Sequence, residues 1–280
     1  MLLEKVLLCT DFSDPAEKLV KCMPELQKSG LREVLVLHVI DIHSAVALQK
    51  DTREKHENKL LRTQKELQGF GLEVATKMVQ GIPSVEIAQT AEEEQVSMIL
   101  LGSHGKGFVK SQFLGSTTFD VLRLTNTPML IEKYMELGDG KIQAYCEQKF
   151  AKVLIPVDFS EASIEMIEEI KGIPGLQEIV LVSVVEKSES PQELENRKKE
   201  WLEELEIMEE EFINLGYHVE SHVREGTASR KIMEVAEEEK ASLIAIATRG
   251  AGTIEGLLIG STIEAIARQS KNPVLVFPSK

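Results

Sequence analysis

The stretch "KVLLCTDFSDPAEK" at residues 5–18 is written a second time in this chain, as "KVLIPVDFSEASIE" at residues 152–165. Each version is an apolar run followed by Asp-Phe-Ser and the polar start of a helix. The next apolar run, "EVLVLHVID" (33–41), returns as "EIVLVSVVE" (178–186). The two versions are 147 positions apart at first and 145 thereafter, which one short deletion near the first helix of the second copy explains. Similarity at a spacing kept to the chain's end indicates an internal duplication.

Each copy alternates apolar β-branched runs with amphipathic stretches, the pattern of a parallel sheet covered by helices. In the first copy we predict strands near 3–10, 33–40, 72–79, 97–102 and 128–132, and helices near 14–28, 47–69, 83–95 and 115–125. In the second we predict strands near 151–157, 178–185, 217–223, 242–247 and 273–277, and helices near 160–171, 190–214, 228–239 and 260–270. The expected organisation is a domain at 1–133, a linker at 134–149 and a domain at 150–280.

Composition narrows the function classes. The chain has 280 residues, enough for two domains of ordinary size, and a formal net charge of −14. An acidic balance argues against binding to nucleic acid or an anionic membrane. Three cysteines without a C-x-x-C pair predict a reducing compartment and no disulfide framework. No apolar run is long enough for a signal or a membrane span, so we expect a soluble cytoplasmic protein.

A glycine-rich stretch, "GSHGKGFVKSQFLGST" (102–117), follows a predicted buried strand and ends at a predicted helix. Gly102, Gly105, Gly115 and Ser116 give the pattern G-x-x-G-x(9)-G-[ST]. Glycines let the backbone run close to a polyphosphate, and unpaired N–H groups at the helix start can donate to its oxygens. The alternative is a set of turn glycines with an ordinary serine cap; the spacing favours phosphate binding.

These motifs carry a resemblance to a known family. "TDFS" and "VDFS" after the first strand, "HVID" after the second, "GIP" before the third helix, the glycine stretch and "TPMLI" together resemble a tandem universal stress protein. The resemblance covers both copies. It implies two α/β domains with a Rossmann-like (adenine nucleotide alpha hydrolase-like) fold, each an open five-stranded parallel sheet with helices on both faces. The ATP-binding branch of the family carries this glycine signature.

The resemblance also implies roles for residues of the first copy. Asp11 and the backbone of Val39 would hold adenine and ribose, Leu101 and Gly102 would lie along ribose and α-phosphate, and the later glycines would wrap the phosphates. Asp11 could equally cap a helix, a compatible role. The predicted nucleotide-binding residues of this copy are Cys9, Thr10, Asp11, Val39, Leu101, Gly102, His104, Gly105, Gly115, Ser116 and Thr117.

The second copy, "ATRGAGTIEGLLIGST" (247–262), has Ala247 where the first has Gly102. A methyl group at a point of close approach can clash with a ligand, so occupancy of this second site stays open. Its predicted residues are Pro156, Asp158, Val184, Ala247, Arg249, Gly250, Gly260, Ser261 and Thr262. Arg249 would add a cation for phosphate, or lie in solvent.

The function predicted is binding of ATP, ADP or AMP by a stress-response sensor that hydrolyses slowly or not at all, with Mg²⁺ carried by the phosphates. The chain has no Walker G-K-[ST], G-x-S-x-G or H-E-x-x-H motif, and no metal site is predicted. A weak ATPase or adenylate-transferring activity through His104 or Arg249 is one alternative. A ligand-free dimerising protein is the other. The apolar last strands predict a pseudo-dimer of the two copies, and association of two chains stays open.

Overall fold

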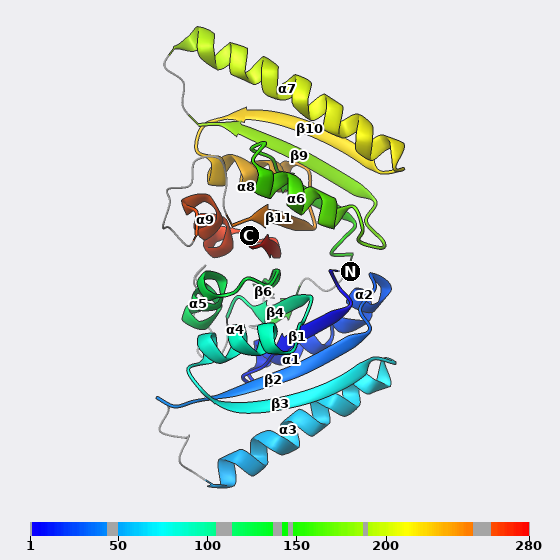
Figure 1. Cartoon of the computed structure of the whole chain (residues 1–280), viewed down its shortest axis with the longest axis vertical. Coiled ribbons are helices and arrows are strands. Elements are labelled where there is room, and N and C mark those ends of the chain that lie inside the picture. The colour runs from blue at the N-terminus through cyan, green and yellow to red at the C-terminus, as the bar shows by residue number, and fades with distance from the viewer. Residues whose placement is uncertain are drawn as a thin grey trace. The chain divides into compact units, whose positions relative to one another are not determined.

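The computed structural model describes residues 2–43, 50–104, 114–136, 142–144, 148–186, 190–248 and 259–279. The chain divides into two compact units, residues 1–147 and residues 148–279. Each unit alternates strands and helices along the chain (Figure 1).

The N-terminal unit is a parallel sheet in the order β5-β4-β1-β2-β3. Its strands are β1 (Lys5–Cys9), β2 (Glu33–Asp41), β3 (Glu73–Gly81), β4 (Met98–Gly102) and β5 (Met129–Glu132). Its helices are α1 (Asp14–Val20), α2 (Met23–Lys28), α3 (Lys50–Gly69), α4 (Pro83–Glu93) and α5 (Ser116–Leu124). Central β1 is covered on both faces, since Val6 and Leu7 are each 0% exposed.

The C-terminal unit repeats this sheet in the order β10-β9-β8-β11-β12. Its strands are β8 (Lys152–Pro156), β9 (Glu178–Val185), β10 (His218–Glu225), β11 (Leu243–Ala247) and β12 (Val274–Phe277). Its helices are α6 (Glu161–Ile170), α7 (Pro191–Asn214), α8 (Ala228–Glu238) and α9 (Ser261–Gln269). The fold class predicted for both copies is confirmed: each is a five-stranded parallel α/β unit.

The helix predicted over residues 14–28 is wrong as a single element, because the structure breaks it into α1 and α2. Pro24 is the physical reason. Proline has no N–H, and its ring clashes with the carbonyl four residues earlier, so it is accommodated only in the first turn of a helix. Pro24 accordingly lies in the first turn of α2. The C-terminal unit forms only α6 in the corresponding segment, where its sequence is shorter.

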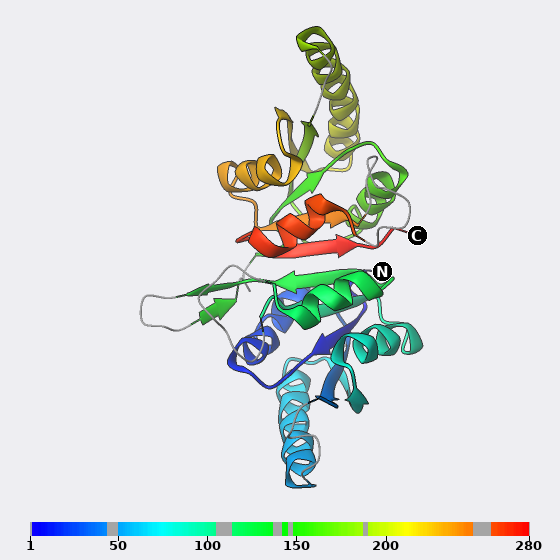
Figure 2. The same cartoon turned by 90° about the vertical axis from the view of Figure 1, so that its left-hand side faces the viewer.

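The segment predicted as a linker contains regular structure. Strands β6 (Tyr134–Glu136) and β7 (Ile142–Ala144) pair antiparallel, with Tyr134 opposite Ala144. Figure 2 shows this short pair extending from the end of β5. Strand β7 contacts α1, so the pair belongs with the N-terminal unit.

The order of the strands defines where a ligand site can form. The chain winds one way from β1 through β2 to β3 and the other way through β4 to β5, so the winding reverses between β1 and β4. In the C-terminal unit it reverses between β8 and β11. Ligands of open α/β sheets bind at the carboxyl ends of the strands at this switch point.

Two expectations from composition can be compared with the structure. Within the described residues, no helix combines the length and the apolar character that crossing a membrane requires. Cys9 is a free thiol buried in β1, and burial raises its pKa. Cys22 is disulfide-bonded, which departs from the expectation of a chain without a disulfide framework.

Candidate nucleotide site

Asp11 follows β1 at the switch point of the N-terminal unit and is half-buried. Its Oδ1 accepts hydrogen bonds from the Ser13 backbone N–H at 2.9 Å and from the Ser13 hydroxyl. The Ser13 Oγ in turn accepts from the Ala16 N–H at 3.4 Å and caps α1. Asp11 is therefore not the cap itself, because it orients the serine that caps the helix.

The C-terminal unit repeats this arrangement. Asp158 Oδ1 accepts from the Ser160 N–H at 3.1 Å and from the Ser160 hydroxyl at 2.6 Å. The Ser160 Oγ accepts from the Ser163 N–H at 3.3 Å. Both predicted aspartates are thus held at the same point of the fold by the same local hydrogen bonds.

The residue after each aspartate has an unusual backbone conformation. Phe12 has φ 59° and Phe159 has φ 60°, in the left-handed region that bulky residues rarely adopt. Such a conformation costs roughly 1–2 kcal/mol per residue and persists only where the surroundings enforce it. Its repetition in both units shows that the turn between strand and helix is tightly specified. The sequence signal was the Phe of "DFS", which both copies share, but only backbone angles reveal the strain.

Val39 and Val184, the predicted contacts to the base, are half-buried near the ends of β2 and β9. The side chains beside them differ between the units. His38 is buried, with Nδ1 2.8 Å from the Thr10 carbonyl oxygen and Nε2 2.9 Å from Nδ1 of His56. The Phe12 ring lies 4.3 Å from the His38 ring, centroid to centroid.

In the C-terminal unit, Ser183 takes the place of that first histidine. Its hydroxyl donates to the Val157 carbonyl at 2.7 Å. The Phe159 ring lies 5.7 Å from the ring of Trp201, the single tryptophan of the chain. Sequence reasoning missed these aromatic and histidine neighbours, because helix and strand residues far apart in the chain meet only in the folded unit.

Gly102 ends β4 next to β1, and the carbonyl of Gly102 accepts a hydrogen bond from the Thr118 hydroxyl at 2.8 Å. Its missing side chain has an internal cause. A Cβ on Gly102 would overlap the hydroxyl of Tyr134 and would lie 3.2 Å from the Tyr134 Cε2 atom. Burial raises the pKa of the Tyr134 hydroxyl, and so do the negative charges of Glu132 and Asp11.

Helices α5 and α9 each begin after a glycine, Gly115 (φ −59°) and Gly260 (φ −72°). Neither angle requires glycine. A Cβ on Gly115 would lie 3.4 Å from the Ser103 carbonyl oxygen, and one on Gly260 would lie 3.5 Å from that of Thr248, both ordinary contacts. No side chain caps either helix in the part of the chain that the structure describes.

The other predicted residues fall into three groups. Ser116 and Ser261 are exposed at the first turn of α5 and α9, and Thr117 and Thr262 are half-buried beside them. Buried Leu101 and half-buried Ala247 end their strands, and half-buried Thr10 and Pro156 lie at the ends of β1 and β8. Gly105, Arg249 and Gly250 lie outside the described residues.

His104 is half-buried, with Nδ1 3.0 Å from the hydroxyl of buried Ser103. That hydroxyl is a neighbour within the same loop. The contact fits a loop histidine fixed by local hydrogen bonding.

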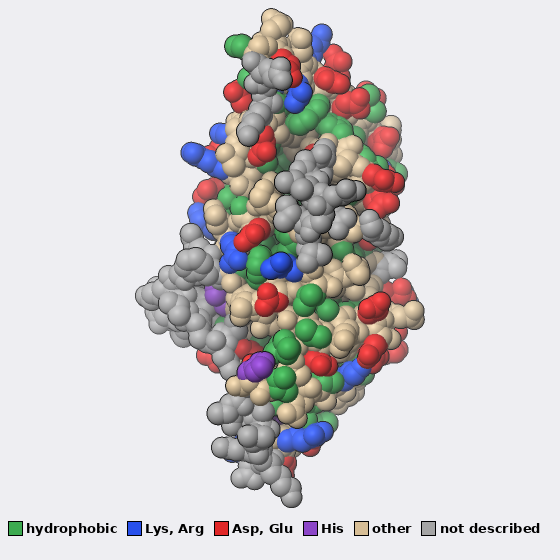
Figure 3. Space-filling view, turned by 60° about the vertical axis from the view of Figure 1, so that its left-hand side comes forward, with side chains coloured by type: hydrophobic (Ala, Val, Ile, Leu, Met, Phe, Trp, Pro, Cys, Tyr) green, Lys and Arg blue, Asp and Glu red, His purple; other side chains and the backbone are tan. Residues whose placement is uncertain are grey.

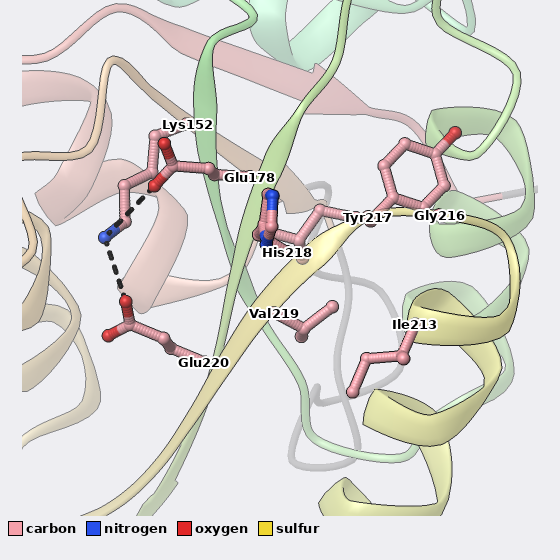
Figure 4. Close-up of a pocket in the computed structure, with 9 residues that line it drawn as sticks. Lys152, Glu178, Ile213, Gly216, Tyr217, His218, Val219 and Glu220 are labelled. Carbon is pink, nitrogen blue, oxygen red and sulfur yellow. Dashed lines mark hydrogen bonds and ion pairs between the residues drawn. The ribbon is translucent and has the colours of Figure 1, made fainter.

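A cavity of about 530 Å³ lies at the amino ends of β8, β9 and β10 in the C-terminal sheet, at the opposite end of these strands from the switch-point site. Figure 4 shows Lys152 there between Glu178 and Glu220. The Lys152 Nζ lies 3.0 Å from a carboxylate oxygen of Glu239, 3.5 Å from Glu220 and 3.7 Å from Glu178. Burial opposes its charge, but these carboxylates hold the pKa of Lys152 above its ordinary value. Ion pairs that stabilise the fold account for this cluster, which lies away from the switch point.

The fold and the switch points define a class: a tandem of Rossmann-like α/β units, each with a strained Asp-Phe-Ser turn after its first strand and a last helix that begins at an uncapped glycine. The family model described as the universal stress protein family matches residues 3–133 and 149–278. This chain therefore belongs to the universal stress protein family, as its motifs predicted.

Individual relatives agree with this assignment. A universal stress protein of Methanocaldococcus jannaschii is 34% identical over 153 residues, which cover 46% of this chain and 94% of the relative. The crystal structure of a universal stress protein from Archaeoglobus fulgidus is 27% identical, with a TM-score of 0.79 and 99% of both chains covered. A universal stress protein structure from Pseudomonas aeruginosa, at 18% identity and TM-score 0.69, covers 99% of this chain and 93% of its own, and shows the fold alone.

Proposed function

We propose that each unit binds an adenine nucleotide (ATP, ADP or AMP) at its switch point, and that the chain is a nucleotide-dependent stress-response protein without rapid hydrolysis. The observation that carries this proposal is the pair of uncapped helix N-termini at Gly115 and Gly260. Asn, Asp and Ser are preferred over glycine at the N-cap, because their side chains accept a hydrogen bond from the first turn. Neither φ nor packing requires a glycine here, so its benefit is access to the N–H groups of the first turn, which bind anions.

Both units also share the aspartate and the strained turn that follows the first strand. Asp11 and Asp158 are fixed by serine, and the strained phenylalanines set the turn that presents them. A carboxylate at one end suits ribose hydroxyls, and a helix N-terminus at the other suits phosphate oxygens. The spacing of the glycine motif fits a nucleotide whose base lies near β2 or β9 and whose phosphates lie near α5 or α9.

The proposal includes no metal site and no catalytic residue of the protein itself; a metal ion would be bound through the nucleotide. Among the described residues, the group that could offer three metal ligands is Glu220, His222 and Glu239, and Lys152 already forms ion pairs with two of them. Mg²⁺ would accordingly arrive on the nucleotide's own phosphates. We assign no general base, because His104 is held by its neighbouring serine.

The surface is consistent with a small-molecule ligand. In the view of Figure 3, Lys and Arg side chains form separate groups among acidic and apolar ones instead of one continuous basic area. A nucleic-acid backbone requires a continuous basic footprint. With a net charge of −14, the protein is proposed to bind no nucleic acid and to hold its anionic ligand by directed N–H groups.

The proposal is tested by heating the purified full chain until it denatures and identifying small molecules in the supernatant by mass spectrometry. AMP, ADP or ATP should be present at a stoichiometry of order one per chain. A supernatant without nucleotide, together with no binding of added ATP, would refute the proposal and favour the ligand-free alternative. Release of labelled phosphate in a single turnover, compared between the native chain and His104→Ala, tests the catalytic alternative: a rate lost on substitution would establish it.

A further inference from the structure

The phenol ring of Tyr134 lies at the switch point of the N-terminal unit, where the proposed ligand would bind. Tyr134 begins β6, two residues after the end of β5. Its hydroxyl lies against the Cα of Gly102, at the end of β4, and within electrostatic range of Asp11, which follows β1. The ring therefore reaches the end of β4, one of the two strands between which the winding reverses.

The Tyr134 hydroxyl is buried and has no hydrogen-bond partner among the described residues. A buried hydroxyl without a partner is destabilising, because it gives up its hydrogen bonds to water. The ring of Tyr134 therefore keeps its buried position despite the unfavourable free energy of its unpaired hydroxyl. A small displacement of β6 would return the hydroxyl to water, and the two-stranded β6–β7 pair has only a short ladder to resist it.

The C-terminal unit has a different pair of residues at the same two positions. Ser279 stands 145 positions after Tyr134, and Ala247 stands 145 positions after Gly102. The Ser279 N–H donates to the Thr248 hydroxyl at 2.9 Å, which keeps this short residue beside the end of β11. Glycine is thus paired with tyrosine in one unit and alanine with serine in the other.

This exchange changes the interpretation of Gly102. The sequence suggested that its missing side chain admits a ligand and that the methyl group of Ala247 hinders one. In the structure, Gly102 admits the phenol of Tyr134. Beside Ala247, the residue at the position of the tyrosine is Ser279, whose short side chain does not need the space. The glycine therefore marks the more obstructed of the two sites.

We propose that Tyr134 occupies the ribose–phosphate position of the N-terminal unit, so that nucleotide enters there only when β6 moves, whereas the C-terminal unit binds nucleotide first. This rests on the proposed nucleotide-binding function and assigns unequal affinity to its two sites. Tyr134 is the residue that sets the difference.

The chain carries a natural probe for the test, because Trp201 lies beside Phe159 in the C-terminal unit. ATP is titrated into the full-length protein by calorimetry, and Trp201 fluorescence is recorded in parallel. We expect two binding phases in the calorimetry. The tighter phase, at the C-terminal unit, should change the Trp201 fluorescence, and the weaker phase, at the N-terminal unit, should not. In Tyr134→Ser, which installs the residue of the other unit, the weaker phase should tighten at least tenfold with the fluorescence titration unchanged. Ser279→Ala is the matched control.

Each other outcome has a defined meaning. If Tyr134→Ser leaves the weaker phase unchanged, the ring does not obstruct the site, and the inference is wrong while the proposed function stands. If Tyr134→Phe and Tyr134→Ser both weaken that phase, the hydroxyl contacts the ligand, which also overturns the inference. If addition of ATP produces neither heat nor a fluorescence change in the native chain or in any variant, the proposed function itself has failed.

A second measurement needs no nucleotide. Gly102→Ala introduces a Cβ that overlaps the Tyr134 hydroxyl, so it should displace the ring and speed hydrogen exchange at the β6 amides. The double variant Gly102→Ala/Tyr134→Ser reproduces the pair of the C-terminal unit and should remove the effect of alanine at position 102. Unchanged exchange in Gly102→Ala would show that the ring does not depend on this space.

Discussion

Replacement of Gly260 by alanine should abolish tight nucleotide binding in the C-terminal unit without unfolding it. Two opposing terms set the stability. Alanine is a poorer N-cap than glycine by roughly 0.5–1 kcal/mol, and it restricts the unfolded chain by about 0.4–1 kcal/mol in the opposite direction. Because φ is −72° and the new Cβ would lie 3.5 Å from the nearest carbonyl oxygen, no strain is added. The free energy of unfolding should change by less than about 1 kcal/mol.

The binding term is larger. A hydrogen bond to a charged group contributes about 1.5–3 kcal/mol, so one helix N–H kept from a phosphate oxygen lowers affinity roughly 10- to 150-fold. Calorimetry with ATP and urea unfolding measure the two quantities on the same variant. Gly69→Ala is the matched control, because a Cβ there has nothing within 4 Å. A Gly260→Ala protein that binds ATP like the native chain would refute the reasoning, whatever its stability.

Three further predictions concern ionisable groups. Lys152→Met should lower stability at pH 7 by about 1 kcal/mol, because half-buried Glu239 and the exposed carboxylates of Glu178 and Glu220 lose their shared cation. Since the hydrogen bond from Lys152 lowers the pKa of Glu239, this deficit, measured by urea unfolding, should be present at neutral pH and disappear as the pH falls through that lowered pKa. Burial lowers the pKa of Lys133 from 10.5 to about 8. The unfolded chain therefore binds more protons than the folded chain between pH 8 and 10.5, and the stability of the native chain relative to Lys133→Met should rise over this range; a difference in urea unfolding that does not vary with pH would contradict this. Cys9, with its pKa raised by burial, should resist iodoacetamide in the native chain and react in urea; rapid native labelling, followed by peptide mass spectrometry, would show that β1 is open.

The strands of the two parallel sheets could be predicted to within two residues because their signal is local, whereas the short β6–β7 pair was predicted as a linker. A run such as "VLLC" or "IVLV" is apolar on both faces, which is typical of a covered parallel strand. The duplication strengthened the strand predictions, because the pattern for each of these strands occurs in both copies. The break between α1 and α2 also had a local signal in Pro24, which the length of the amphipathic pattern outweighed.

The site was less predictable, because its determinants are long-range. The strain at Phe12 is a backbone angle, and the contact between Gly102 and Tyr134 joins residues 32 positions apart. Sequence comparison of the two copies locates both pairs, but it cannot show that one fills the space left by the other. A missing Cβ predicts a close approach without saying what approaches.

The complementary pairs Gly102–Tyr134 and Ala247–Ser279 mean that the two halves of this duplicated chain are no longer interchangeable part by part. A hybrid carrying β11 in place of β4 would press an alanine methyl group against the tyrosine ring, whereas the reciprocal hybrid would leave unfilled volume beside the serine. Any recombination between the halves must therefore transfer the end of the fourth strand together with the residues that follow the fifth.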